Sequence, residues 1–512
     1  MEKELKLQVT AGKASQIMHA PAVSRLMNGS AYSDDLVSTY FDTPDMHLRK
    51  SGASLRVRTV GEQRLQTLKL EGTITAGLFE RDEFECPVNE DRPDLDALLA
   101  LIPKDSKAIQ ILAEPELAER LDPLFLTRIS RCAATLQLPD GTELELAMDD
   151  GAVEATAGPS APIHGIELEL KSGEPEQLYK LALAILHDVP LRIDHLSKAD
   201  RGYGLLVQEP SAAVRAEPLK LKKRDSVEEA FRAIARNCLA QIHGNERGVV
   251  FGQDPSSVHQ MRVGLRRLRS ALDLFAPVIP APTDFDSELR WIAGELGQAR
   301  DWKVLAGATL KKAFGSAADD ADATAVQHAA QAIATENRKA AVAAVNSVRY
   351  TRLIIQFTLW INLKGWRTNQ SKEFLDTLDK PITGFASETL KRRHKKLLKR
   401  GDGLAELDDE TRHRARIAAK KVRYATEFFA SLFDRRAVKH YINALSDLQD
   451  DLGWRNDVVV ASGLLRSLGE TKPETAAGAG FARGYLASRA AEDHDAMKAL
   501  WKKFSRLAVP HL

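Results

Sequence analysis

Charged and apolar residues alternate in short segments along the first 200 residues of the chain. In the first segment, residues 2–6, an extended strand would place Glu2, Glu4 and Lys6 on one face. Later segments repeat the alternation, with apolar residues on the opposite face: residues 54–58, 67–71, 143–149 and 166–171. A single strand of this kind is typical of a solvated sheet edge. Its recurrence predicts several strands around a common centre, in a β-barrel with a charged lumen and an apolar exterior covered by helices.

The charged faces of these strands carry both acids and bases, which suits a phosphate ligand together with a metal ion. Lysine and arginine bind phosphate oxygens, arginine in bidentate fashion. Clustered carboxylates bind Mg²⁺ or Mn²⁺, which in turn bridge phosphates. Charges that are removed from water need partners, and a metal with a polyanion supplies them. The strands therefore predict a metal-dependent site for a phosphate chain inside the barrel.

The second half of the chain has a different composition and the opposite charge. Residues 1–208 contain 22 Lys and Arg against 34 Asp and Glu, whereas residues 209–512 contain 50 against 37. Pro210 and Pro218 bracket small residues at the boundary, and long Ala-, Leu- and Arg-rich stretches beyond it predict helices. Within this half we expect an Ala-rich helix at 317–348 and a Gly-rich loop at 476–480.

An internal repeat marks the helical half. The motif His259-x-x-Arg262-x-x-x-Arg266-Arg267-x-Arg269 is matched by His413-x-x-Arg416-x-x-x-Lys420-Lys421-x-Arg423. A Leu-Gly-x-x-x-Asp block ends 42 residues after the first histidine, at Asp301, and 44 residues after the second, at Asp457. On a helix, the His-headed basic residues of each motif fall within an arc of about 80°. The repeat predicts two helical bundles related by a pseudo-twofold axis.

A basic stripe on a helix is usually a solvated face, but two copies at the same spacing favour a functional surface. The motifs contain no His-x-x-x-His pair and no cysteine, which disfavours a metal site. A polyanion is the better ligand, because the histidines can donate hydrogen bonds to its phosphates. Neither stripe is interleaved with aromatic residues for base stacking, so nucleic acid is disfavoured as a partner.

A set of motifs in residues 1–206 resembles the CYTH superfamily, the triphosphate tunnel metalloenzymes. The motifs occur in the order of the family: Glu2-x-Glu4-x-Lys6, Tyr-Phe-Asp-Thr-Pro at 40–44, Leu-Arg-Val-Arg at 55–58, Thr-Leu-Lys at 67–69, Gly-Leu-Phe-Glu-Arg-Asp-Glu at 77–83, Phe-Leu-Thr at 125–127 leading to Arg131, residues 145–151, Glu-Leu-Glu-Leu at 167–170 and Ser-Lys-Ala-Asp-Arg-Gly-Tyr at 197–203. The resemblance implies an eight-stranded antiparallel tunnel. It also implies hydrolysis or cyclisation of a triphosphate-bearing substrate with a divalent metal.

The resemblance further implies roles for the matching residues. The metal would be held by Glu2 and Glu4 of the first strand and by Glu167 and Glu169 of a late strand. The phosphates would be bound by the basic residues Lys6, Arg56, Arg58, Lys69, Arg81, Arg131 and Lys198, the last from a helix that plugs one end of the tunnel. The residues expected to be catalytic are Glu4, Lys69 and Lys198. The acids Glu83, Glu145 and Asp149 are expected either on the acidic wall or in structural pairs with lumen arginines.

The helical half, at about residues 222–506, resembles the CHAD domain, which is commonly found after CYTH. The resemblance implies binding of inorganic polyphosphate and recruitment to polyphosphate granules. The residues that would bind polyphosphate are His259, Arg262, Arg266, Arg269, His413, Arg416, Lys420 and Arg423. In the second repeat Lys420 and Lys421 replace arginines of the first, which keeps the charge but loses the bidentate contact.

Cysteine usage and hydropathy indicate the cellular context. Cys86, Cys132 and Cys238 have no metal-site spacing, which predicts a reducing compartment without a disulfide framework. The chain starts with a charged strand instead of a signal peptide, and no apolar run approaches about 18 residues. We therefore expect a cytoplasmic protein without a membrane span.

Together these patterns predict an α+β protein with a tunnel domain at 1–206, a linker at 207–221 and a helical domain at 222–506. Its expected activity is hydrolysis of inorganic triphosphate with Mg²⁺ or Mn²⁺, because CYTH–CHAD fusions resemble the inorganic triphosphatases. Three alternatives remain open. The tunnel could act on an organic triphosphate such as thiamine triphosphate or an RNA 5′ end, it could cyclise ATP, or the protein could be a polyphosphate-granule scaffold with a weak tunnel.

Overall fold

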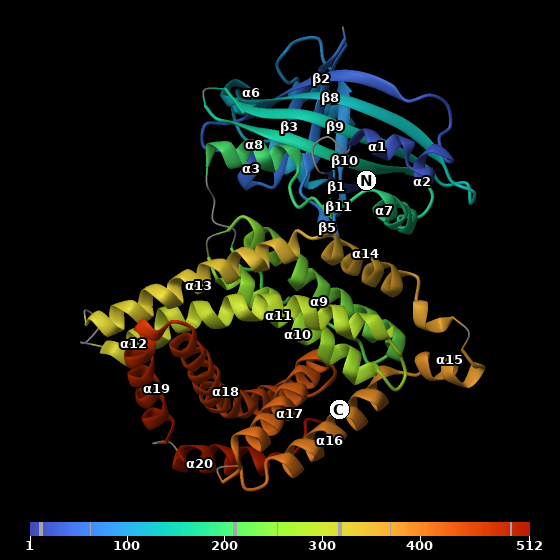
Figure 1. Ribbon diagram of the computed structural model, residues 1–512. Coiled ribbons are helices and arrows are strands. Elements are labelled where there is room, and N and C mark those ends of the chain that lie inside the picture. Colours follow the sequence, from blue (N-terminus) through green and yellow to red (C-terminus); the bar gives the residue numbers. More distant parts are fainter. Residues whose placement is uncertain are drawn as a thin grey trace. The chain divides into compact units, whose positions relative to one another are not determined.

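The computed structural model describes residues 1–9, 14–61, 63–156, 158–207, 212–252, 254–315, 320–368, 370–404, 406–491 and 494–511. The chain forms two compact units (Figure 1). The first comprises Met1–Ser211 and Asn346–Leu363, and the second comprises Ala212–Val345 and Lys364–Leu512. Within the expected linker, residues 208–211 lie outside the described ranges.

The first unit is built on one antiparallel sheet, in which the described residues form eleven strands. The strands are β1 (Glu2–Val9), β2 (Tyr32–Asp42), β3 (Ala53–Val60), β4 (Gln63–Leu70), β5 (Thr73–Thr75), β6 (Leu78–Arg81), β7 (Glu83–Pro87), β8 (Asp122–Gln137), β9 (Glu143–Ala155), β10 (Ser160–Ser172) and β11 (Leu191–Ile193). Their order is β5-β6-β1-β10-β9-β8-β2-β3-β4-β7, and β11 pairs with β1 beyond the end of β6. The expected α+β class with a curled antiparallel sheet is therefore confirmed.

The two ends of this strand order are joined by the chain itself. Only Asp82 separates β6 from β7, yet β6 pairs with β1 and β7 pairs with β4. The amide of Leu70 donates to the carbonyl of Asp82 (3.0 Å) at the break between them. If β6 and β7 are taken as one interrupted strand and the short β5 and β11 are set aside, the ring has the eight strands that the sequence predicts.

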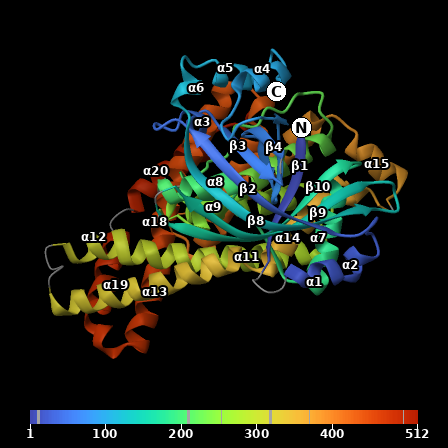
Figure 2. The same cartoon turned by 90° about the horizontal axis from the view of Figure 1, so that it is seen from above.

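Helices cover the apolar outer face of the sheet. In this unit they are α1 (Ala14–His19), α2 (Pro21–Ser24), α3 (His47–Lys50), α4 (Leu95–Leu101), α5 (Lys107–Leu112), α6 (Leu117–Arg120), α7 (Glu176–Asp188), α8 (Lys198–Leu206) and α14 (Val348–Asn362). The group α4–α6 closes a core over β3 and β4, and Figure 2 shows these helices together. Leu55 of β3 and Leu68 of β4 are fully buried there. Burial of one strand face leaves the alternate, charged face to the lumen.

The last of these helices, α14, comes from the middle of the helical half of the sequence. It packs on α7 and β11, and the hydroxyl of Thr351 accepts a hydrogen bond from the amide of Ile193 (3.3 Å). Because β11 pairs with β1, α14 supports the back of the strand that carries Glu2, Glu4 and Lys6.

The second unit is helical. Its helices are α9 (Val227–Val250), α10 (Ser256–Phe275), α11 (Thr283–Val304), α12 (Leu310–Phe314), α13 (Ala321–Val345), α15 (Lys372–Leu378), α16 (Ile382–Arg400), α17 (Asp409–Phe428), α18 (Arg435–Thr471), α19 (Ala476–Ala491) and α20 (His494–Ser505). In the first half α10 packs on α9 and α11, and α11 packs on α13. The second half has the same order of packing, because α17 packs on α16 and α18, and α18 packs on α19.

Two sequence expectations for this unit have different outcomes. The Ala-rich segment forms the helix α13, although residues 316–319 at its expected start lie outside the described ranges. The Gly-rich loop expected at 476–480 is wrong, because α19 begins at Ala476. Gly478 lies against the backbone of Asp322, where a Cβ would meet the carbonyl oxygen at 2.5 Å. At this position glycine therefore allows two helices to pack closely and does not form a turn.

Within the described residues, every helix is either too short or too polar to cross a lipid bilayer.

Candidate functional site

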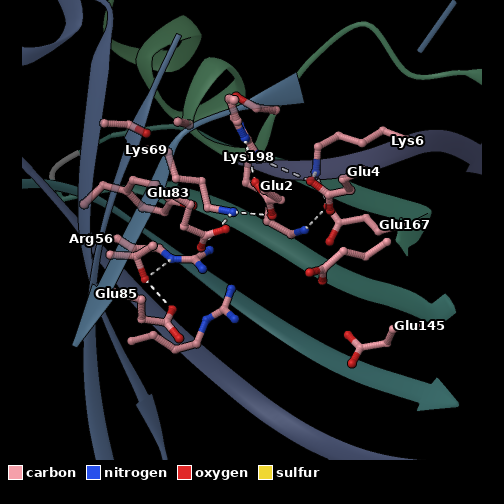
Figure 3. A pocket seen from close by; sticks show the side chains of 18 of the residues that line it. Glu2, Glu4, Lys6, Arg56, Lys69, Glu83, Glu85, Glu145, Glu167 and Lys198 are labelled. Carbon is pink, nitrogen blue, oxygen red and sulfur yellow. Dashed lines mark hydrogen bonds and ion pairs between the residues drawn. The ribbon is translucent and has the colours of Figure 1, made fainter. Parts of the chain in front are cut away.

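The curled sheet encloses a cavity of about 320 Å³ (Figure 3). All eleven residues predicted for the tunnel site line it: Glu2, Glu4, Lys6, Arg56, Arg58, Lys69, Arg81, Arg131, Glu167, Glu169 and Lys198. They come from six strands and from the start of α8. The structure thus brings the whole predicted set together, while the role of each residue stays a prediction.

The acids of β1 lie in a dense ion-pair network at one side of the cavity. Glu2 accepts from Lys69 Nζ (2.8 Å) and from Arg81 Nε (2.9 Å). Glu4 contacts Lys6 Nζ (2.7 Å) and Arg81 (3.2 Å). Burial alone would raise the pKa of Glu2, but Lys69 and Arg81 outweigh it and hold the pKa well below its usual range. The Glu2 carboxylate is therefore charged at neutral pH.

Glu167 and Asp149 form the second focus of the network. Glu167 contacts Lys6 (2.5 Å), Lys198 (2.6 Å) and Arg131 (2.6 Å). Asp149 accepts two hydrogen bonds from Arg131 (2.7 and 2.8 Å) and contacts Lys198 (2.6 Å). Two acids thus hold the three cations in fixed positions around the cavity.

Arg56 and Arg58 of β3 differ from the other bases. Among the described residues, no carboxylate lies within ion-pair distance of either guanidinium. Arg56 instead donates to Thr67 (3.4 Å), and Arg58 donates to Ser38 (3.1 Å). Burial, together with Arg56 and Arg131, lowers the pKa of Arg58 to about 10. Among the described residues these two guanidiniums thus have no direct ion-pair partner, although Glu83 and Glu85 act on Arg56 from farther away, and an anion would supply a direct partner.

A row of carboxylates crosses three neighbouring strands on another wall. The pairing register places Glu4 of β1 opposite Glu169 of β10, and Glu169 opposite Glu145 of β9. Burial raises the pKa of Glu169, and Glu145 and Glu2 add to the rise against the opposing effect of Lys171. Within the described ranges, no three acid, histidine or cysteine side chains are already grouped to enclose a metal ion. The all-oxygen donor set of the row nevertheless suits Mg²⁺ or Mn²⁺.

The helix α8 presents Lys198 to the cavity from a rigid start. Ser197 caps the helix by accepting from the Asp200 amide (3.0 Å), and the Ser197 amide donates to the Asp200 carboxylate (3.0 Å) in a capping box. Arg49 of α3 holds Asp200 (2.8 Å), and Arg201 holds Asp194 just before the helix (2.8 Å). Two ion pairs, one to α3 and one to the segment before the helix, therefore hold α8 and fix the position of Lys198.

In the second unit the two repeat motifs lie on α10 and α17, which pack against each other. We call Arg262, Arg266, Arg300, Arg416 and Lys420 the inner cluster. Their charges act on one another across the repeats: Arg266 of α10 contributes to lowering the pKa of both Arg416 and Lys420 of α17. Burial, followed by Arg416 and Arg266, lowers the pKa of Lys420 to about 7. The structure thus brings basic side chains of both motifs together.

The other four residues predicted to bind polyphosphate are not part of the inner cluster. Burial and three arginines lower the pKa of His259 to about 4, so this histidine is neutral at pH 7. His413 is exposed, and its Nδ1 lies 3.0 Å from Asn456 Oδ1. Arg269 pairs with Asp286 (3.4 Å) and Arg423 with Glu427 (2.7 Å). These two arginines already have acidic partners.

Two family models match the chain: the CYTH domain over residues 1–203 and the CHAD domain over residues 233–466. The chain joins a CYTH domain to a CHAD domain. A curated relative of the CYTH domain, the inorganic triphosphatase of Haemophilus influenzae, is 30% identical over 169 residues, which is 33% of this chain. The match spans 45% of that relative, so this chain covers about half of its length.

Two solved structures are similar to parts of this chain. The CHAD domain from the plant Ricinus communis is 39% identical with a TM-score of 0.53, over 59% of this chain and 99% of that chain. A putative adenylyl cyclase from Hippeastrum, described as having a dominant triphosphatase activity, is 19% identical with a TM-score of 0.30. It covers 39% of this chain and 93% of its own, and a similarity at this level adds no argument.

Several residues of the CYTH cavity were missed or left open by the sequence prediction. Tyr40, Glu85 and Lys171 line the cavity without having been assigned. Lys171 continues the period-two series of Glu167 and Glu169, and this series was the signal that could have identified it. Of the acids left open, Glu83 contacts Lys69 (3.1 Å), and Asp149 is a structural partner of Arg131.

Proposed function

We propose that the CYTH domain hydrolyses inorganic triphosphate to pyrophosphate and phosphate with Mg²⁺ or Mn²⁺. The observation that carries this proposal is the division of one cavity into a carboxylate row and a pair of buried arginines for which the described residues offer no carboxylate within ion-pair distance. The row can receive a divalent cation, and the arginines can receive the phosphate oxygens. The CYTH match over residues 1–203 and the 30% identity over 169 residues with an inorganic triphosphatase support this substrate.

In this proposal each side chain has a simple task. Arg56, Arg58 and Arg131 bind and orient the phosphate chain, while Lys69 and Lys198 offset charge on its oxygens. Glu4 and Glu169, with Glu2, would hold the metal, which would offset phosphate charge and lower the pKa of water. Glu167, also predicted as a ligand, is already held by three cations.

The acids and arginines of the cavity suit attack by water on the bound phosphate chain. Since the attacking group is water, the chain needs no nucleophile of its own, and its acids orient the water. The arginines already lie in fixed positions before substrate enters, so little reorganisation is required when charge shifts in the transition state.

We further propose that the CHAD domain binds inorganic polyphosphate and brings the protein to polyphosphate granules. The inner cluster supports this proposal, because five buried or half-buried cations from two repeats converge there. A phosphate chain offers many anionic oxygens at once and would offset their mutual repulsion.

Release of phosphate from tripolyphosphate, ATP and long-chain polyphosphate, with and without Mg²⁺ or Mn²⁺, tests the catalytic proposal. We expect a metal-dependent preference for tripolyphosphate that is lost in Glu4→Gln. The matched control is Glu80→Gln, because Glu80 pairs with Lys3 on the outer face of the same strands (3.7 Å). Pyrophosphate release from ATP without free phosphate would instead indicate cyclisation. No turnover of any substrate, with polyphosphate binding retained, would favour a scaffold.

A further inference from the structure

The helix α16 carries a dense run of basic residues that lies outside the two repeat motifs. Residues 391–400 read Lys-Arg-Arg-His-Lys-Lys-Leu-Leu-Lys-Arg, with seven Lys and Arg and no acid. Five of these side chains are exposed and share an arc of about 140° on the helix. We call this surface the α16 stripe: Lys391, Arg392, Lys395, Lys396 and Lys399.

Packing of the opposite face of α16 directs the stripe outward. His394 is buried, and its Nδ1 lies 2.6 Å from the hydroxyl of Tyr441. Leu397 is buried in a core cluster with residues of α17 and α18. Arg393 turns inward from the run and binds Asp273 (2.6 Å). The orientation of the stripe is therefore set by apolar packing, and its charges are not needed for the fold.

The charge of the stripe is uncompensated. Within the described part of the chain, no carboxylate lies within 4.0 Å of any of its five cations. Lys391, Lys395 and Lys399 follow one another at i,i+4, where like charges destabilise a helix. Cations are favoured in the last turn of a helix, but the stripe extends two turns before it. A repulsive row of this length on an exposed face fits a polyanionic ligand.

The side chains beside the stripe on α16 indicate which class of polyanion could bind to it. No large hydrophobic or aromatic side chain of α16 is exposed. Single-stranded nucleic acid would use aromatic side chains for base stacking, and a bilayer would use apolar side chains for insertion. A bare phosphate chain requires only cations.

We propose that the α16 stripe is a second binding surface for inorganic polyphosphate, separate from the inner cluster. This inference rests on the proposed polyphosphate binding by the CHAD domain. The charged groups that act most strongly on Lys420 lie on α10, α17 and α18, and none lies on α16. A long chain that occupies both surfaces gains avidity that a short chain does not.

The test compares two triple variants of the full-length protein that remove the same charge. K391Q/K395Q/K399Q removes the stripe lysines, and K303Q/K311Q/K312Q removes exposed lysines of α11 and α12. We expect the stripe variant to bind long-chain polyphosphate about tenfold more weakly, with a flatter dependence on salt, while the control binds like wild type. Both variants should keep the wild-type melting temperature, because none of these lysines has an acidic partner among the described residues.

The other outcomes are decisive as well. Equal weakening in both variants would show a general charge effect and overturn the inference. Wild-type binding by the stripe variant, with binding lost in R266A/R416A, would also overturn it and leave the proposed function standing. Failure of wild type to bind polyphosphate would refute both. Stripe-dependent binding of single-stranded RNA or anionic vesicles, but not polyphosphate, would assign the stripe to a different partner.

Discussion

Asp149→Asn tests whether buried acids of the cavity serve as counter-charges for the bases that we propose to bind phosphate. The Asp149 side chain is 2% exposed and contacts both Arg131 and Lys198. In the variant these two cations would share Glu167 alone. Breaking a buried ion pair costs about 3–5 kcal/mol. Because Glu167 stays within 2.6 Å of both cations, we expect the lower end, about 3 kcal/mol of unfolding free energy.

Thermal unfolding without metal, with and without tripolyphosphate, measures this effect. A loss of about 3 kcal/mol should lower Tm by about 6–12 °C in a unit of this size. Tripolyphosphate supplies the missing negative charge, so it should stabilise the variant more than wild type at the same concentration. The control is Asp150→Asn, whose carboxylate is 74% exposed and pairs with His164 outside the cavity. An unchanged Tm together with lost metal dependence would refute the reasoning and make Asp149 a metal ligand.

The pH dependence of stability offers a second readout of Asp149→Asn. Burial would raise the pKa of Asp149, but Lys198 and Arg131 outweigh it and hold the pKa below its usual range. A carboxylate with a lowered pKa stabilises the fold above its unfolded pKa of about 3.9, and this contribution is lost as pH falls through the folded value. Wild type should therefore lose stability on acidification more steeply than Asp149→Asn.

Two further predictions concern α8 and the inner cluster. In Gly202→Ala, the new Cβ would meet the ring of Phe125 at 2.0 Å and displace the helix that carries Lys198, so we expect about 1–3 kcal/mol of destabilisation and a lower kcat for tripolyphosphate. The control Gly204→Ala, whose Cβ would meet nothing within 4 Å, should keep wild-type activity and gain up to about 1 kcal/mol; equal kinetics in both variants would contradict this. Because the pKa of Lys420 is lowered to about 7, polyphosphate affinity should fall as pH rises through 7, and Lys420→Arg should flatten that profile in a titration series.

The cavity residues could be predicted because the period of a strand is two. Once alternate residues such as Leu5 and Leu168 are buried on the outside, Glu4, Lys6 and Glu167 have only the lumen to enter. The repeat motifs were visible for a similar reason, because helical spacing places basic residues of one motif on one face. Local periodicity thus predicted which side chains line the cavity or share one face of a helix.

Other features depend on contacts between distant residues. The sequence left open whether Asp149 would stand on the acidic wall or pair with a lumen arginine, because the answer depends on Arg131 of the neighbouring strand. The sheet closes at Asp82 because the consecutive strands β6 and β7 pair with different strands, β1 and β4. The Gly-rich start of α19 was misread because glycine also permits close helix contact, as at Gly478. No local pattern distinguishes these cases.

The helix α14 belongs to the tunnel unit but is encoded within the helical half of the sequence, and this limits where the gene can be cut or recombined. The chain passes from one unit to the other at residues 211, 345 and 363, so neither unit is encoded by one continuous stretch. A cut after residue 211 would remove α14 from the tunnel unit and expose the apolar surfaces of α7 and β11 that it covers. Recombination that separates the two halves at a single point would thus produce an incomplete tunnel domain. We therefore expect that a working fragment of the tunnel needs residues 346–363 supplied as a second segment.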